Sequence, residues 1–434
     1  MILKDIMSAS FGISEKVTDM VLEAEQSASL RFTDIDTIAQ INQAKVLKAF
    51  ADNMIGEAHF VSTSGYGYND TGREALDRVY AQVFGCEDAL VRHNIISGTH
   101  AISTALFGVL RPGDTLLAAT GKPYDTLEQV IGISSDSNNN SGSLADFGVQ
   151  YKQTELKSDG SIDFECLRTA IDSSVKAVLF QRSKGYEWRN TLTVAQLNDA
   201  IAFVHSINPY LVCLVDNCYG EFTETTEPNA DLLMGSLIKN PGGGLAQTGG
   251  YIAGKQKYVE LAANRLTSVG VGKECGATIG QNKPMIQGFF MAPHITAQAL
   301  KSAVLCRAVF VNMGFEVSPA ADNAVSDIIC AIKFNDWDLV VAFCQGIQKG
   351  APVDSFAEPQ PWDMPGYDHQ VIMAAGAFVQ GASIELSADS PKREPYVAYM
   401  QGGLTYESAK IGIMTAVQKV ADAISKKSHT RSST

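Results

Sequence analysis

The sequence predicts an α/β protein with a large domain, built on a mostly parallel sheet flanked by helices, and a smaller α+β C-terminal domain. Three observations support this prediction. Apolar strand-like runs alternate with helical patterns between residues 88 and 254, which favours a parallel sheet. Polar residues fall just past the ends of these runs, where open α/β sheets bind their ligands. The chain has 434 residues, enough for two domains.

Residues 13–56 carry apolar side chains at helical spacing and are predicted to be helical. The predicted strands of the large domain are residues 88–94, 115–120, 175–181 and 211–216, and the helices between them are 97–110, 163–171 and 194–207. Residues 135–143 are polar and of low complexity, which predicts a surface loop.

A second set of elements follows residue 254. The pattern predicts helices at 258–266, 293–312, 336–346 and 407–425, a strand at 326–333, a strand pair at 381–386 and 396–399, and a disordered polar tail at 426–431. The expected domains are an N-terminal helical arm (1–60), a large domain (61–300) and a small C-terminal α+β domain (301–434).

Composition excludes several classes of function. The formal net charge is -13, which argues against nucleic acid or an anionic membrane as the main partner. The hydrophobic content of 45% fits an ordinary soluble globular protein. No apolar run approaches the roughly 20 residues that a membrane helix needs. The N-terminal residues Met1–Asp5 lack the long apolar centre of a signal peptide. We therefore expect a cytoplasmic protein.

The cysteines show no metal-binding spacing. The eight cysteines are Cys86, Cys166, Cys213, Cys218, Cys275, Cys306, Cys330 and Cys344. They are scattered, without a C-x-x-C pair or a nearby histidine at zinc spacing, so we expect reduced thiols and no metal site. Cys218 lies beside Asp216 and either packs in the core or touches a ligand.

The strongest candidates for chemistry are an acid and a lysine between residues 214 and 254. One apolar run ends in Asp216; a second, which flanks Ser236, ends in Lys239, and three glycines follow at 242–244. Burial disfavours an ammonium, so we expect the pKa of Lys239 to lie below its usual value of about 10.4. Such an amine condenses with an aldehyde to form a Schiff base. The pair therefore indicates cofactor chemistry.

Three further segments follow predicted strands. Ser97, Gly98 and Thr99 open a helix, whose N-terminal N–H groups and partial positive charge suit a bound anion. A well-capped helix with Ser97 as the N-cap explains the same residues. Tyr124 is either a functional aromatic or an ordinary loop residue. Arg182 and Lys184 either help to hold an anion or are ordinary loop charges.

Residues 62–73 form a loop rich in glycine and aromatic residues. Glycine supplies unusual backbone angles, and tyrosines supply flat surfaces with a polar tip. The loop is therefore either a plain surface loop or a contact to another subunit, with Tyr66, Tyr68 and Arg73 as the candidate residues.

Four segments resemble those of a known enzyme family in their order and spacing. They are Ser97-Gly98-Thr99-His100-Ala101, Tyr124-Asp125-Thr126-Leu127, Asp216-Asn217-Cys218-Tyr219-Gly220-Glu221 and Ser236-Leu237-Ile238-Lys239-Asn240-Pro241. Over nearly its whole length the chain resembles the fold-type-I, aspartate aminotransferase-like enzymes that use pyridoxal 5'-phosphate (PLP). It is most similar to the methionine gamma-lyase and cystathionine lyase group, in the branch of aluminium resistance proteins. This resemblance implies a seven-stranded type of sheet in the large, PLP-binding domain.

The resemblance also implies roles for the candidate residues. Lys239 is expected to bind PLP covalently, Asp216 to pair with the pyridine nitrogen, and Tyr124 to stack on the ring and pass protons near the substrate. The expected cofactor-binding residues are Ser97, Gly98, Thr99, Tyr124, Asp216, Ser236 and Lys239.

Two expected contacts lie outside this set. Arg393, in the small domain, either binds the substrate α-carboxylate or is an ordinary surface arginine. The loop with Tyr66, Tyr68 and Arg73 is expected to cross the subunit interface to the cofactor phosphate, in a homodimer or homotetramer with sites at the interface.

The reaction implied is the elimination of a sulfur group from the β or γ carbon of a cystathionine-like or methionine-like amino acid, giving a keto acid and ammonia. Two features depart from the family pattern: Ile238 replaces a hydroxyl residue before the lysine, and Arg73 follows Tyr68 by five residues rather than two. Two alternatives stay open. One is a PLP-dependent aminotransferase, decarboxylase or aldolase; the other is a PLP-binding stress or metal-resistance protein without appreciable turnover.

Overall fold

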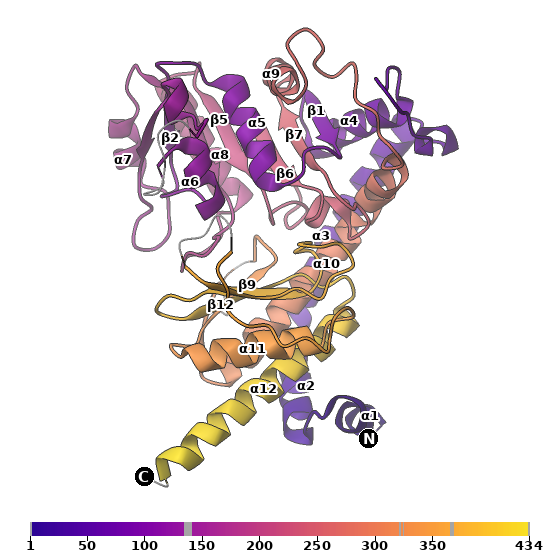
Figure 1. Cartoon of the computed structure of the whole chain (residues 1–434), viewed down its shortest axis with the longest axis vertical. Coiled ribbons are helices and arrows are strands. Elements are labelled where there is room, and N and C mark those ends of the chain that lie inside the picture. Colours follow the sequence, from indigo (N-terminus) through magenta and orange to yellow (C-terminus); the bar gives the residue numbers. More distant parts are fainter. Residues whose placement is uncertain (1, 134–140, 321–322, 324, 365–368, 433–434) are drawn as a thin grey trace. The chain divides into compact units, whose positions relative to one another are not determined.

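The computed structural model describes residues 2–133, 141–320, 323, 325–364 and 369–432 (Figure 1). The chain forms two compact units. The large unit contains Gln40–Gly185 and Arg189–Pro293, and the small unit contains Met1–Ala39, Tyr186–Trp188 and His294–Thr434. Two helices, α3 (Ser29–Asp52) and α10 (Asn282–Asn312), contribute residues to both units. The predicted polar loop at 135–143 lies, up to residue 140, outside the described residues.

The large unit is built on a seven-stranded sheet with the strand order β1-β7-β6-β5-β4-β2-β3. Its strands are β1 (Asp88–Arg92), β2 (Thr115–Ala118), β3 (Gln150–Gln153), β4 (Val175–Gln181), β5 (Val212–Asp216), β6 (Leu232–Ser236) and β7 (Gly250–Gly254). Neighbouring strands run parallel except at β7, which pairs antiparallel with both β1 and β6. The prediction of a mostly parallel α/β sheet is confirmed.

Helices cover both faces of this sheet (Figure 1). They are α4 (Thr71–Phe84), α5 (Gly98–Val109), α6 (Asp125–Ile131), α7 (Phe164–Ala170), α8 (Val194–Ile207) and α9 (Gln256–Leu266), with short 3-10 turns η1 (Glu57–Phe60), η2 (Ala145–Phe147) and η3 (Asn240–Gly242). Leu214 of β5 packs in one core cluster with α5 and α9, whereas its neighbour Val215 packs in the opposite cluster with α4 and α8. Because both faces are buried, the strands read as continuous apolar runs in the sequence.

Strand register brings the carboxyl ends of three strands to one edge of the sheet. Gln181, the last residue of β4, pairs with Asp216, the last residue of β5. Asp216 in turn pairs with Met234 of β6, two residues before that strand ends at Ser236. The loops that follow these strands therefore begin side by side, where ligands of open α/β sheets bind.

The small unit is built on a five-stranded antiparallel sheet with the order β10-β11-β12-β9-β8. Its strands are β8 (Glu316–Ser318), β9 (Ile329–Lys333), β10 (Val371–Ala374), β11 (Ser387–Pro391) and β12 (Val397–Gln401), and its helices besides the shared ones are α1 (Ile2–Phe11), α2 (Glu15–Ser27), α11 (Trp337–Lys349) and α12 (Tyr406–Ser432). Apolar residues of this sheet, α11 and α12 form one core cluster.

Three predicted elements of the small unit are wrong. The long helix α10 begins at Asn282 rather than at Pro293, which lies inside it. Residues 381–386 form turns and not a strand, although their alternating apolar residues are buried. The tail at 426–431 continues α12 as a helix.

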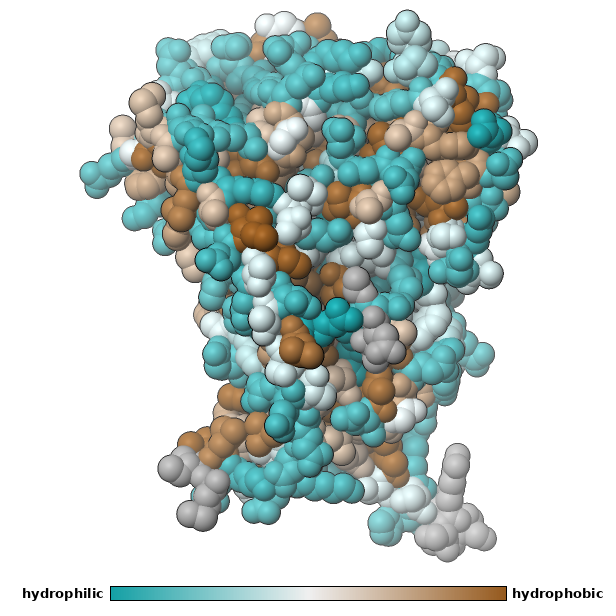
Figure 2. All heavy atoms as spheres, turned by 180° about the vertical axis from the view of Figure 1, so that it is seen from behind, coloured by the Kyte–Doolittle hydropathy of each residue, from teal (hydrophilic) through white to brown (hydrophobic). Residues whose placement is uncertain are grey.

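The described residues contain no helix that is both long enough and apolar enough to cross a membrane. On the face shown in Figure 2, hydrophilic residues predominate and apolar residues are scattered between them.

Candidate active site

Asp216 and Lys239 are brought to the same site by neighbouring strands. Asp216 ends β5, and Lys239 follows the end of β6 by three residues. Asp216 is buried and Lys239 is partly buried. The charge of each group shifts the pKa of the other, so the predicted acid and amine lie within electrostatic reach of each other.

The pKa of Lys239 lies above its usual value, so the predicted lowering is wrong for this arrangement. Burial lowers the pKa, as expected, but the acidic groups of Cys218, Tyr219, Asp216 and Glu221 outweigh burial and raise it. The aliphatic neighbours of Lys239 in the sequence indicate only the effect of burial. Asp216 ends β5, and the other three acidic groups lie on the turn that follows it. A positive charge on Lys239 is therefore favoured by its surroundings.

Burial raises the pKa of Asp216 above its usual value, whereas the positive charge of Lys239 and a backbone contact lower it. That contact is the N–H of Cys218, which donates to Oδ1 of Asp216 over 3.1 Å. A buried carboxylate with few donors is stabilised by any cation brought against it. Asp216 is thus suited to pair with a protonated ring nitrogen.

The N-terminus of α5 lies against the same turn. Ser97 is the N-cap, and its Oγ accepts a hydrogen bond of 3.0 Å from the N–H of His100. A Cβ atom added to Gly98 would lie 2.8 Å from Sγ of Cys218 and 3.8 Å from Cβ of Ser236. Glycine at 98 therefore allows the helix to approach Cys218 closely, whereas the distance to Ser236 is an ordinary contact. The first N–H groups of such a helix can bind an anion.

The hydroxyl groups of the candidate anion site already have partners. Oγ1 of Thr99 lies 2.6 Å from Oγ1 of Thr126. Ser236 is buried, and its Oγ donates to the carbonyl of Gly249 over 3.4 Å and accepts from the N–H of Ile238 over 3.4 Å. These two contacts of Ser236 are long and leave its hydroxyl weakly held.

Tyr124 lies at the start of α6, at the carboxyl side of β2. Its N–H donates to Oε1 of Gln181 over 2.8 Å, which joins its backbone to the end of β4. A Cβ atom on Gly185 would lie 3.2 Å from the Tyr124 ring, so the ring packs over that glycine. Its stacking on a cofactor ring stays a prediction.

Tyr219 is a site residue to which the sequence analysis gave no role. Nζ of Lys239 lies 3.8 Å from the centroid of the Tyr219 ring, a distance at which an ammonium is attracted to an aromatic face. The φ angle of Tyr219 is 71°, in the left-handed region that bulky residues rarely adopt. The only sequence signal for a role of Tyr219 is its position three residues after Asp216, because a positive φ angle at a tyrosine cannot be predicted from the sequence.

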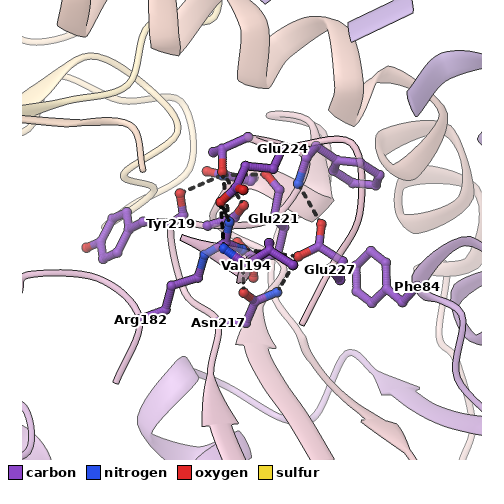
Figure 3. Close-up of polar contacts among 12 residues, drawn as sticks. Phe84, Arg182, Val194, Asn217, Tyr219, Glu221, Glu224 and Glu227 are labelled. Carbon is purple, nitrogen blue, oxygen red and sulfur yellow. Dashed lines mark hydrogen bonds and ion pairs between the residues drawn. The ribbon is translucent and has the colours of Figure 1, made fainter. Parts of the chain in front are cut away.

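A polar network joins Arg182 to the turn that carries Asn217, Glu224 and Glu227 (Figure 3). The side chain of Arg182 is 0% exposed and forms ion pairs with Glu224 (2.9 Å) and Glu227 (3.2 Å). It also donates to Oδ1 of Asn217 over 2.8 Å. Arg182 is therefore engaged within the protein, and the prediction that it holds an exogenous anion is wrong.

Glu221 is a buried acid with no predicted role. Its Oε1 accepts a hydrogen bond of 2.8 Å from the hydroxyl of Tyr251, and Oε2 has no hydrogen-bond partner among the described residues. Burial raises the pKa of Glu221 to about 8, to which Glu227 adds, while Tyr251 and Lys239 act in the opposite direction. Most Glu221 side chains are therefore uncharged at neutral pH.

The loop at residues 62–73 has two exposed tyrosines, and a buried arginine anchors its backbone. Tyr66 and Tyr68 are 75% and 58% exposed, and their rings stack with centroids 5.7 Å apart. Arg73 is buried, and its guanidinium donates to the carbonyls of Gly67 (2.7 Å) and Gly276 (2.8 Å). Arg73 thus holds its own loop, and of the three candidate residues the two tyrosines are exposed.

Arg393 belongs to the small unit, between β11 and β12. Its Nη2 donates to the carbonyl of Tyr186 over 3.3 Å and lies 3.7 Å from Oε1 of Glu187. The guanidinium side chain is 36% exposed, so part of its donor surface is accessible to a ligand. Binding of a substrate carboxylate by Arg393 stays a prediction.

One group of possible metal ligands occurs among the described residues, and it consists of His205, Cys213 and Asp231. Asp231 already accepts hydrogen bonds from the N–H of Cys213 (2.7 Å) and is paired with Nζ of Lys255 (2.6 Å). Burial raises the pKa of the Cys213 thiol, which disfavours the thiolate that metals bind. We therefore interpret the group as an internal hydrogen-bonded and ion-paired cluster rather than as a metal site.

Comparison with known proteins assigns the family. The family model described as methionine gamma-lyase matches residues 17–421. The uncharacterized protein YnbB of Bacillus subtilis is 48% identical over 408 residues, which cover 93% of this chain and 96% of YnbB.

Solved structures agree. The structure of a carbon–sulfur lyase involved in aluminium resistance from Clostridium novyi is 49% identical, with a TM-score of 0.93 and coverage of 97% of this chain and 99% of that one. A protein from Clostridium acetobutylicum, provisionally named a cystathionine beta-lyase involved in aluminium resistance, is 48% identical with a TM-score of 0.93, covering 96% and 99% of the two chains. The PLP-dependent protein YhfS of Escherichia coli shares the fold at 17% identity and a TM-score of 0.60. The chain therefore belongs to the methionine gamma-lyase family, in the branch that contains carbon–sulfur lyases involved in aluminium resistance.

Proposed function

We propose that the protein is a PLP-dependent carbon–sulfur lyase that removes a sulfur group from the β or γ carbon of a cystathionine-like or methionine-like amino acid and yields a keto acid and ammonia. The observation that carries the proposal is the placement of Lys239 and Asp216 at one edge of the sheet, each within electrostatic reach of the other. An amine and a buried acid in this arrangement are the two groups that PLP chemistry requires of a protein. Membership of a carbon–sulfur lyase family supports the choice of reaction.

The residues at this edge fit the cofactor. Lys239 would hold its aldehyde carbon covalently, and Asp216 would hold its pyridine nitrogen in the protonated form. The N-terminus of α5 would bind its phosphate, through the N–H groups of Gly98 and Thr99 and the hydroxyl of Ser97. Glycine at 98 supports this assignment, because it lets α5 approach the turn that carries Cys218. A structural neighbour from Campylobacter jejuni, 13% identical, contains a pyridoxyl-lysine.

When bound, PLP withdraws electrons from the α carbon of the amino acid. The remaining steps belong to residues of this chain. Asp216 keeps a proton on the ring nitrogen by its negative charge. Lys239, once released from the cofactor, takes the α proton at Nζ as a general base, which contributes roughly 10²–10⁴-fold. The proton for a γ elimination would pass through Lys239 or the hydroxyl of Tyr124.

Arg393 would bind the α-carboxylate of the substrate. Arginine holds a carboxylate with two parallel N–H donors, and one Nη of Arg393 is already held by the carbonyl of Tyr186. Fixing the carboxylate would set the orientation of the α carbon toward the base. The sulfur leaving group is inferred from the family alone.

We also propose that the protein is a cytoplasmic homodimer or homotetramer with active sites at the subunit interface. The stacked, exposed rings of Tyr66 and Tyr68 support this proposal, because exposed aromatic side chains are enriched in protein interfaces. Replacing both tyrosines by serine should lower the mass measured by light scattering. An unchanged mass would show that the two tyrosines do not hold the subunits together.

A spectrum of the purified protein, followed by product assays, tests the function. A bound Schiff base absorbs visible light, and borohydride reduction fixes it to the chain. Release of pyruvate or 2-oxobutyrate with ammonia from a panel of thio-amino acids would support the lyase. Transfer of the amino group to an added keto acid would identify an aminotransferase instead, and a coloured protein without product would identify a PLP-binding protein without turnover.

A further inference from the structure

The turn after β5 brings the ring of Tyr219 against Lys239. Nζ of Lys239 lies 3.8 Å from the ring centroid, and both residues are partly buried. The attraction between an ammonium and an aromatic face grows when the pair is withdrawn from water. Partial burial of the pair therefore strengthens this contact over a similar one on the surface.

The backbone around Tyr219 is built to hold the ring in this place. Tyr219 has a φ of 71°, a conformation that is unfavourable for a residue with a side chain and persists only when its surroundings fix it. Asn240, the residue after Lys239, donates from Nδ2 to the carbonyls of Tyr219 (3.0 Å) and Glu221 (2.9 Å). The residue next to the lysine thus ties down the turn that carries the ring.

A second contact, between Gly220 and Arg182, restricts the residues that the turn can accommodate. A Cβ atom on Gly220 would lie 2.5 Å from Nη1 of Arg182, and Arg182 is itself held by Glu224 and Glu227. The residue after Tyr219 must therefore be small, and the turn cannot relax toward Arg182. Strain maintained by contacts on both sides is typical of functional sites.

The other groups near Lys239 are poor partners for its ammonium when a cofactor is bound. In the proposed function, the charge of Asp216 is used by the ring nitrogen. Burial raises the pKa of the Cys218 thiol far above its usual range, and raises that of Glu221 to about 8, so both are mostly uncharged at neutral pH. Tyr251 and Tyr80, which also face Glu221, have raised pKa values and are neutral. The face of the Tyr219 ring attracts a cation through its π electrons.

We propose that Tyr219 is a positioning residue whose ring holds the ammonium of Lys239 while the lysine is not covalently bound to the cofactor. This inference rests on the proposed function, because it concerns the interval in which Lys239 has been released and carries the proton taken from the substrate. The ring keeps Nζ at the turn beside Asp216, from which it can return to the cofactor.

The test compares Tyr219→Phe, which keeps the ring, with Tyr219→Leu, which removes it. The control is Tyr210→Leu, because Tyr210 is 81% exposed and precedes the opposite end of β5. The apparent pKa of Lys239 is obtained from the pH dependence of the rate at which the cofactor-free protein forms the Schiff base with added PLP. This readout is independent of turnover. Steady-state kcat and KM are measured on the reloaded enzymes.

The expected result is a pKa of Lys239 that is lower by about one unit in Tyr219→Leu, lowered by less in Tyr219→Phe, which keeps the ring but loses the acidic hydroxyl, and unchanged to within about 0.3 unit in Tyr210→Leu. We expect kcat of Tyr219→Leu to fall about 5- to 20-fold, with KM changed less than about twofold. Should the leucine variant fail to fold, Tyr219→Met provides a second side chain without a ring.

Two results would overturn the inference. One is a leucine variant with the pKa and kcat of the wild type; the other is a phenylalanine variant that changes as much as the leucine variant, which would assign the effect to the hydroxyl. A wild-type protein that forms no Schiff base at all would instead overturn the proposed function, and the inference with it.

Discussion

A Cβ atom on Gly235 would lie 2.4 Å from Oε1 of Glu221, so strand β6 carries a glycine at the point where a buried carboxyl group needs the space. The same atom would lie 2.4 Å from the ring of Tyr251, whose hydroxyl donates to that oxygen. The centre of the sheet and the turn that carries Asp216 and Tyr219 are thus fitted to each other around Glu221.

Gly235→Ala should lower the free energy of unfolding by about 1–3 kcal/mol, because the methyl group overpacks a filled interior. Urea denaturation measures the change. Gly56→Ala is the matched control, since the nearest atom to its added Cβ, apart from the glycine and its neighbours, is 3.8 Å away. A Gly235→Ala variant as stable as this control would mean that the carboxyl group is free to move.

Glu221 should make the protein less stable as the pH rises from about 5 to 8. Its pKa is raised from 4.5 to about 8 in the folded protein, so in this window the folded chain holds a proton that the unfolded chain releases. Stability is therefore lost with rising pH, at up to about 1.4 kcal/mol per pH unit. Glu221→Gln should remove this contribution to the slope, measured by denaturation at several pH values.

The control for this series is Glu358→Gln, because Glu358 is exposed and should leave the slope as it is. An unchanged slope in Glu221→Gln would show that the carboxyl group is ionised throughout the window. Infrared spectra provide an independent check, since the stretching band of a protonated carboxyl group should be lost in the glutamine variant.

Gly98→Ala should weaken PLP binding by about tenfold or more, because the added methyl group would meet Sγ of Cys218 at 2.8 Å and displace the N-terminus of α5. Cys218→Ala makes room for that methyl group, so the double variant should bind PLP more tightly than Gly98→Ala alone. Fluorescence titration with PLP measures both. Strictly additive losses would show that the helix and the turn do not press on each other at this point.

Arg393→Met should raise KM for the amino acid substrate by about 10- to 100-fold with little change in kcat, because a charged hydrogen-bonded pair contributes about 1.5–3 kcal/mol. Lys392→Met, at the neighbouring position, should leave KM near that of the wild type. The KM for the substrate amide, which lacks the carboxylate, should be unchanged in both variants. An equal loss with the amide would show that Arg393 does not bind the carboxylate.

The sequence predicted the sheet and the Asp216–Lys239 pair because both depend on local patterns. A strand buried on both faces must be continuously apolar. The first polar residue after such a run then marks the end of the strand in the sequence, as Asp216 does. Asp216 and Lys239 could be paired because each lies just past such a run.

The features that the sequence did not reveal depend on contacts between distant segments. The raised pKa of Lys239 comes from Asp216 at the end of β5 and from three acidic groups on the turn after it. Arg182 is held in the interior by glutamates about 40 residues further along the chain. Residues 381–386 alternate like a strand, yet Glu385 accepts the N–H groups of Phe378 and Val379 and closes a turn. Alternating apolar residues indicate that every second side chain is buried, and a turn can bury its side chains in the same pattern.

The central claim is that Lys239 is covalently bound to PLP at the edge of the sheet. The most direct measurement is the mass of the peptides obtained after borohydride reduction of the purified protein, with Lys239→Ala as the comparison. We predict that the peptide containing Lys239 gains the mass of a reduced pyridoxyl phosphate, and that Lys239→Ala loses the visible absorbance and releases PLP on dialysis. A modified peptide that does not contain Lys239, or a Lys239→Ala variant that still retains reducible PLP, would contradict the account.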